Sequence, residues 1–149
     1  MKYGIYVYSE TGHTLSVVKL LKAELEDLGN EVKIITLEAC NPKSDKRLKY
    51  VPDAAGYDHI IFASPVQGFS LSQTMFEFLT KVKMPKQQLV SLLITQHLKK
   101  AWLGGTRSLN QMKKLLLVHE AKLMNEYDVH WSSKDREEQI QEALKVLSS

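Results

Sequence analysis

Hydroxyl groups and glycine cluster in the segment YSETGHT, residues 8–14, where an apolar run ends and a helical pattern begins. The predicted helix has no acidic residue in its first turns, because the next carboxylate after Glu10 belongs to Glu24. Free backbone N–H groups and the positive end of a helix dipole attract anions. This segment therefore predicts an anion site, with a phosphate group as the expected ligand.

Four residues of this segment suit a phosphate. Gly12 lets the backbone approach closely, and the hydroxyls of Ser9, Thr11 and Thr14 can each donate a hydrogen bond to a phosphate oxygen. The alternative is that Thr14 is an ordinary N-cap and the segment a solvated turn. The G-x-x-x-x-G-K-[ST] and G-x-G-x-x-G phosphate loops are excluded, because neither pattern occurs in the sequence.

Alternating strand and helix patterns must position this segment. Five segments rich in apolar and β-branched residues predict strands: Tyr3–Tyr8, Val32–Leu37, His59–Ala63, Leu89–Thr95 and Ala121–Trp131. The fifth alternates more than the others, which favours an edge strand or a strand with a bulge. Helical stripes lie between the strands, so we expect a parallel sheet with helices on both faces. Residues 38–57 lack helical periodicity and predict a long loop or a short irregular helix.

Size and composition narrow the possible functions. The 149 residues suit one domain, and the 20 Lys and Arg against 17 Asp and Glu give a mild excess of +3. The basic run KSDKRLK (43–49) is interrupted by an acid and predicts a solvated loop, so no nucleic-acid partner is expected. Cys40 is the single cysteine, and the five histidines show no helical pairing, so no metal site is expected. With no signal peptide or membrane span apparent, we expect a cytoplasmic protein.

Two further loops follow predicted strands three and four. They are SPVQGFSLS (64–72) and TQHLKKAWLGGT (95–106), both rich in glycine and polar groups and lacking charged pairs suited to acid–base catalysis. Ligands of open parallel sheets bind beyond the carboxyl ends of the strands. The two loops therefore predict the walls of a slot for a flat ligand, and no catalytic side chain is expected.

The three loops together resemble the flavodoxin family. YSETGHT is similar to the flavodoxin phosphate loop [ST]-x-T-G-x-T, YDHIIFASPVQG to the third strand and first flavin loop, and LLITQHLKKAWLGG to the second flavin loop. The resemblance implies a flavodoxin-like three-layer α/β sandwich over residues 1–149, with strand order 2-1-3-4-5. It also implies FMN as the cofactor. The implied cofactor-binding residues are Ser9, Thr11, Gly12, His13 and Thr14 for the phosphate, and Pro65, Val66, Gln67, Gly68, Phe69, Thr95, Gln96, His97 and Trp102 for the ring.

The sequence departs from the family pattern in three respects. His13 stands where many flavodoxins have Asn, the chain is mildly basic, and the loop after strand three offers Gln67 and then Phe69 in place of the usual stacked aromatic. Gly68 either eases rotation of a peptide near the flavin or forms a plain tight turn. Trp102 either covers the flavin or packs under the glycine pair at 104–105, whereas Trp131 is expected to pack in the domain.

Two redox functions fit this resemblance. The first is electron transfer between redox partner proteins. The alternative is an NAD(P)H-dependent reductase of a quinone, a flavin or another small acceptor, in which Lys99, Lys100 and Arg107 meet the nucleotide. A flavin-free binding domain is a third possibility, and a phosphoacceptor receiver domain is disfavoured because strand one ends in a single acid. We expect a monomer or a weak homodimer.

Overall fold

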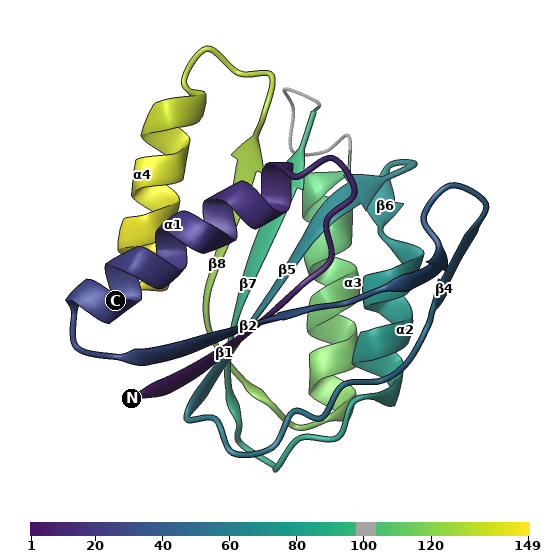
Figure 1. The fold of residues 1–149 in the computed structure, drawn as a ribbon, viewed down its shortest axis with the longest axis horizontal. Helices are drawn as coiled ribbons and strands as arrows, with labels where there is room; N and C mark the ends of the chain where they lie inside the picture. Colours follow the sequence, from purple (N-terminus) through teal and green to yellow (C-terminus); the bar gives the residue numbers. More distant parts are fainter. Residues whose placement is uncertain (98–103) are drawn as a thin grey trace.

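The computed structural model describes residues 1–97 and 104–149 of the chain. In this part of the chain, five strands form a parallel sheet: β1 (Lys2–Val7), β2 (Glu31–Thr36), β5 (His59–Gln67), β7 (Leu89–Gln96) and β8 (Lys122–His130). Their order is β2-β1-β5-β7-β8, which confirms the order that the resemblance implied. All carboxyl ends therefore lie along one edge of the sheet, at the top of Figure 1.

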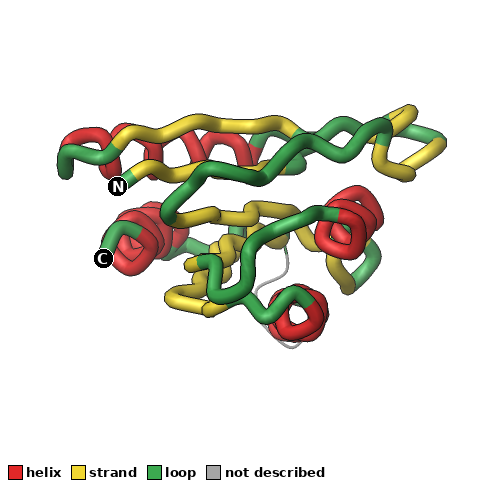
Figure 2. Tube along the Cα trace, turned by 90° about the horizontal axis from the view of Figure 1, so that it is seen from below, coloured by secondary structure: helices red, strands yellow, loops and turns green. Residues whose placement is uncertain are grey.

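Helices cover both faces of this sheet, as predicted. The described residues contain α1 (His13–Asp27), α2 (Gln73–Lys81), α3 (Gly105–Val118) and α4 (Arg136–Leu147). Helices α1 and α4 pack on one face, and α2 and α3 pack on the other (Figure 1). The view from below shows the strands between these two helical layers (Figure 2). No described helix is long and apolar enough to cross a membrane.

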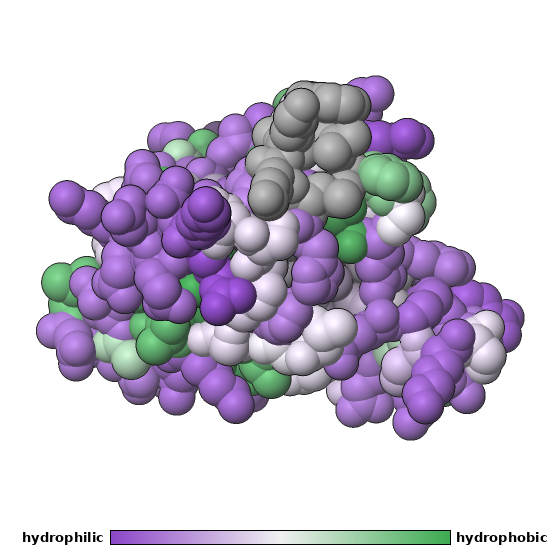
Figure 3. Space-filling view, turned by 90° about the horizontal axis from the view of Figure 1, so that it is seen from above, coloured by the Kyte–Doolittle hydropathy of each residue, from purple (hydrophilic) through white to green (hydrophobic). Residues whose placement is uncertain are grey.

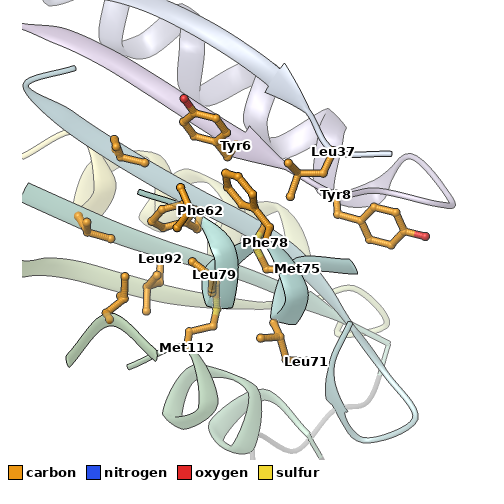
Figure 4. Packing of buried hydrophobic residues seen from close by; sticks show 14 of the residues in the cluster. Tyr6, Tyr8, Leu37, Phe62, Leu71, Met75, Phe78, Leu79, Leu92 and Met112 are labelled. Carbon is orange, nitrogen blue, oxygen red and sulfur yellow. The ribbon is translucent and has the colours of Figure 1, made fainter. Parts of the chain in front are cut away.

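Each face of the sheet has its own hydrophobic core. On the α2–α3 face, the rings of Tyr6, Phe62 and Phe78 contact one another, with centroids 5.2–6.0 Å apart (Figure 4). On the α1–α4 face, Leu21 and Leu25 of α1 are fully buried, as their helical spacing predicts. The sheet is thus fixed from both sides, and the loops at its carboxyl edge start from rigid elements.

Residues 38–57 fold differently from the expectation of a loop or an irregular helix. They contain an antiparallel hairpin of β3 (Ala39–Asn41) and β4 (Asp45–Leu48). Its strands are too short and polar to show a clear alternation in the sequence. The hairpin is tied to α2, because Thr74 Oγ1 donates to the Lys46 carbonyl and the Leu48 N–H donates to Glu77 Oε2, both at 2.8 Å.

The last strand is both an edge strand and a bulged strand, as its alternation predicted. Strand β8 ends the sheet order, and its register with β7 shifts so that Met124 has no partner between Leu123 and Asn125. Asp135 is the N-cap of α4, the helix that follows this strand.

Candidate functional site

The first loop joins β1 to α1 and leaves the start of this helix open. Gly12 is the N-cap, its φ of 89° lies in the left-handed region, and it has no side chain of its own to cap the helix. The first turn has no acidic residue. The Ser9 hydroxyl accepts a 3.4 Å hydrogen bond from the Leu15 N–H, so Ser9 already bends over the helix start. These features preserve the anion site that the sequence predicted.

Thr14 has a different role from the expected one. Its side chain is buried, and its hydroxyl lies 2.7 Å from the Thr95 hydroxyl at the end of β7. The hydroxyl therefore ties α1 to the sheet. The interpretation of Thr14 as an N-cap is also wrong, because Gly12 holds that position. The Thr14 backbone N–H lies in the first turn of α1.

Glu10 brings a carboxylate to the first loop, where it would oppose an anion. The carboxylate accepts a 2.8 Å hydrogen bond from the Tyr8 hydroxyl and forms an ion pair with Lys46 of β4. Lys46 also donates to the Pro42 carbonyl. The β3–β4 hairpin thus supplies a cation that compensates Glu10. Sequence reasoning missed Lys46, since nothing in its spacing links it to a loop 36 residues earlier.

The second loop is shorter than the sequence indicated. Strand β5 extends through Gln67, and the chain then turns back into β6 (Ser70–Leu71), which pairs antiparallel with β5. Gly68 and Phe69 form the turn with φ of 56° and 65°, the two positive values of a type I′ hairpin. Gly68 therefore lies in a tight turn. The Phe69 side chain is 57% exposed at the tip.

The third loop begins at the end of β7 with Thr95, Gln96 and His97. Thr95 and Gln96 are buried, and His97 is exposed. Trp102, together with Lys99 and Lys100, lies outside the described residues.

An aromatic and cationic wall closes the site on the α4 side. The His13 ring stacks on the Trp131 indole with centroids 4.2 Å apart and an interplanar angle of 13°, and His97 meets His13 edge-on at 5.1 Å. The Arg136 guanidinium lies 4.8 Å from the Trp131 ring centroid. Burial, and then the charges of His97 and Arg136, lower the pKa of His13. Trp131 packs against the core as expected, but its place in this wall was missed.

The three loops and this wall surround a pocket of about 110 Å³ at the carboxyl edge of the sheet. Figure 3 looks onto this edge, where hydrophilic residues cover most of the visible face. The residues around the pocket are Glu10, Thr11, His13, Pro65, Val66, Gln67, Thr95, Gln96, His97 and Trp131. A second hollow of about 200 Å³ lies beside it and shares Val66, Gln96 and His97. The structure therefore brings predicted residues from all three loops together, although Ser9, Gly12 and Thr14 do not line these hollows.

A largely buried carboxylate lies behind this pocket. Asp128 Oδ2 of β8 accepts a 2.5 Å hydrogen bond from Gln96 Nε2 and lies 3.4 Å from His130 Nε2. Burial raises the pKa of Asp128, while His130 and the Gln96 hydrogen bond act in the opposite direction. Asp128 and His130 are two residues apart in β8, so their side chains lie on the same face of the strand. No cluster of His, Cys, Asp or Glu in the described residues could hold a metal ion.

Solved structures with the same fold identify this architecture. A flavodoxin from Streptococcus pneumoniae TIGR4 matches with a TM-score of 0.70 at 15% identity, over 99% of this chain and 98% of that one. Oxidised flavodoxin 2 from Bacillus cereus matches with a TM-score of 0.69 at 16% identity, over 97% and 96% of the two chains. The chain has the flavodoxin fold. A C101A mutant of flavodoxin from Pseudomonas aeruginosa agrees, with a TM-score of 0.69 at 14% identity over 99% and 97%.

Sequence comparison adds nothing to this result, because no protein-family model and no curated protein matches the chain. In the flavodoxin fold, the carboxyl edge beside β1 and β5 is the topological switch point, where the chain order of the strands reverses. The pocket lies at this edge. The fold and the loop sequences therefore indicate the same place for a ligand.

Proposed function

We propose that the chain binds FMN at the carboxyl edge of the sheet and serves as a redox protein. The observation that supports this most directly is the open start of α1, with a glycine N-cap and no acidic residue in the first turn. A phosphate dianion suits backbone N–H groups and hydroxyls in such a place. Ser9 and Thr11 are placed to donate from their side chains, and Gly12, His13 and Thr14 from their backbones.

The ring would enter between the second and third loops. Pro65, Val66 and Gln67 line one side of the pocket, and Thr95 to His97 line the other. The bound flavin would supply electron transfer, and the chain would position the ring and limit its access to water. The hairpin with Gly68 and Phe69 at its tip holds its own side of the slot rigid. Phe69, exposed at that tip, is a natural first contact for a redox partner.

Titration of the ligand-free protein with FMN, riboflavin and FAD tests this proposal. Each hydrogen bond to a charged group is worth about 1.5–3 kcal/mol, so loss of two such bonds weakens binding by at least about a hundredfold. We expect FMN to bind at least that much more tightly than riboflavin, with a shifted flavin absorption spectrum. Equal affinities would refute the phosphate site, and the absence of any flavin binding would favour the flavin-free domain.

A reductase is the second candidate, supported by a cationic hollow on α3. Arg107 and Lys114 line an open hollow of about 490 Å³ together with Thr106, Asn110 and Gln111. Two cations in a hollow suit the phosphates of NAD(P)H or an acidic surface of a partner protein. Steady-state oxidation of NAD(P)H by the FMN-loaded protein, with quinone as acceptor, separates these uses. NAD(P)H oxidation that is slower in Arg107→Gln than in wild type would identify a reductase. No detectable oxidation would support the electron carrier instead.

A further inference from the structure

A buried amide and a largely buried carboxylate lie at the carboxyl ends of β7 and β8, each with one unused hydrogen-bonding atom. Gln96 is 3% exposed and donates to Asp128 Oδ2 at 2.5 Å. The remaining oxygens, Gln96 Oε1 and Asp128 Oδ1, are buried without a hydrogen-bond partner. Unsatisfied buried acceptors are rare in folded proteins, and a proton on the carboxyl group would provide a donor where two acceptors now lack one.

The start of α3 is built around this pair. A Cβ atom on Gly105 would lie 2.0 Å from Asp128 Oδ2 and 2.3 Å from Gln96 Nε2, so only glycine lets the helix approach. The positive end of α3 favours a charged Asp128. Burial favours the neutral form. Because these two effects oppose each other, a change in nearby charge can shift the protonation of Asp128.

Other charged groups face Asp128 from β8 and α3. His130 Nε2 lies 3.4 Å from the carboxylate. Glu126 occupies the same face of β8 one step earlier and pairs with Lys113 of α3 at 2.7 Å. The Lys113 cation thus compensates Glu126, which leaves the neighbourhood of Asp128 without a large net charge. A new charge in the pocket would therefore shift the pKa of Asp128.

Gln96 connects Asp128 to the pocket. Gln96 lines both the 110 Å³ pocket and the adjoining hollow, and its side-chain amide donates a hydrogen bond to the Asp128 carboxylate. Resting on the FMN binding proposed above, we propose that Asp128 takes up a proton when flavin in this slot is reduced. Gln96 is then a positioning residue that transmits the charge of the ring to a buried acid.

The proposed step balances in charge and atoms. Reduction of a bound flavin by two electrons and one proton would add one negative charge to the pocket. The Asp128 carboxylate accepts a second proton from water and becomes neutral. The electrons come from dithionite in the experiment and from a redox partner in the cell. The summed charge of ring and carboxyl group is unchanged, which spares the buried site a second uncompensated anion.

The pH dependence of the two-electron midpoint potential tests this step. One proton per two electrons lowers the potential by about 30 mV per pH unit, and two protons lower it by about 59 mV. We expect a segment with the steeper slope between pH 5 and 8 in the FMN-loaded protein, and about 30 mV throughout in Asp128→Asn. Asp135→Asn makes the same change at an exposed position at the start of α4 and should keep the wild-type slope.

The possible outcomes separate this inference from the proposed function. Failure to bind FMN would refute both the proposed function and the proton uptake by Asp128. Tight FMN binding with parallel lines of about 30 mV per pH unit for wild type and Asp128→Asn removes this inference alone. Should Asp128→Asn not fold, the carboxyl ¹³C shift of Asp128 in the wild-type protein decides. It must titrate at higher pH in the reduced than in the oxidised form, and an unchanged titration overturns the proposal.

Discussion

His59 provides a prediction that needs no ligand. This histidine begins β5, is 3% exposed, stacks on Tyr3 with ring centroids 4.9 Å apart, and lies 2.8 Å from the Ser91 hydroxyl through Nε2. Burial lowers the pKa of His59 from 6.5 to about 4. The neutral ring is thus the form that the fold accommodates, and protonation favours unfolding.

The sign and size of the effect follow from linkage. The unfolded chain binds the His59 proton below pH 6.5, whereas the folded protein binds it only near pH 4. His59 therefore adds its full stability above pH 6.5, and this contribution falls as the pH drops from 6.5 to 4. At 1.36 kcal/mol per pKa unit, the loss is about 2 kcal/mol at pH 5 and about 3 kcal/mol at pH 4.

Urea unfolding between pH 4 and 8 measures this loss. The double variant His59→Phe with Ser91→Ala keeps the ring stack and removes both hydrogen-bonding partners. We expect the difference in unfolding free energy between wild type and this variant to be constant above pH 7 and to fall by about 2 kcal/mol at pH 5. All other titrating groups cancel in the difference. Parallel pH profiles for the two proteins would refute the reasoning.

Three further substitutions test the packing and the loop. Gly4→Ala would place a Cβ 2.9 Å from the Tyr57 ring, so we expect about 1–3 kcal/mol less stability in urea unfolding, and no loss would mean that the ring moves freely. Gly12→Ala meets no atom within 4 Å but must keep a φ of 89°, so it should cost about 1–2 kcal/mol through backbone strain, with Ser16→Ala as a control on the same turn. Tyr6→Phe removes the buried hydroxyl that donates to the Asp53 carbonyl and should cost about 1–3 kcal/mol, and an unchanged midpoint would show that water replaces it.

The sequence predicted the sheet because its signals are local. Continuous apolar runs mark β1, β5 and β7, and Gly29 marks the end of α1. The β3–β4 hairpin was missed because polar strands of three and four residues show no clear pattern. A tight turn at Gly68 was one of two alternatives, but its type I′ form was not predicted, because Gly68 is followed by Phe69 and a bulky residue with positive φ is unusual at such a position.

The candidate site was predicted in outline for the same reason. The segments at residues 8–14, 64–72 and 95–106 follow predicted strands, and parallel strands bring their carboxyl ends together whatever the side chains are. Partners from distant elements were not predictable. Three such partners are Lys46 of the β3–β4 hairpin, Trp131 just after β8, and Asp128 within β8. Their contacts with the site exist only in the folded chain.

The unpaired Met124 in β8 has a consequence for how copies of the chain meet. A flat terminal strand offers a row of free amides and carbonyls to a neighbour, which is a common start of polymerisation. The extra residue bends this border of the sheet, and Lys122 adds a charge at its beginning. Concentrated solutions should therefore stay free of strand-swapped fibres, and deletion of Met124 should remove that protection.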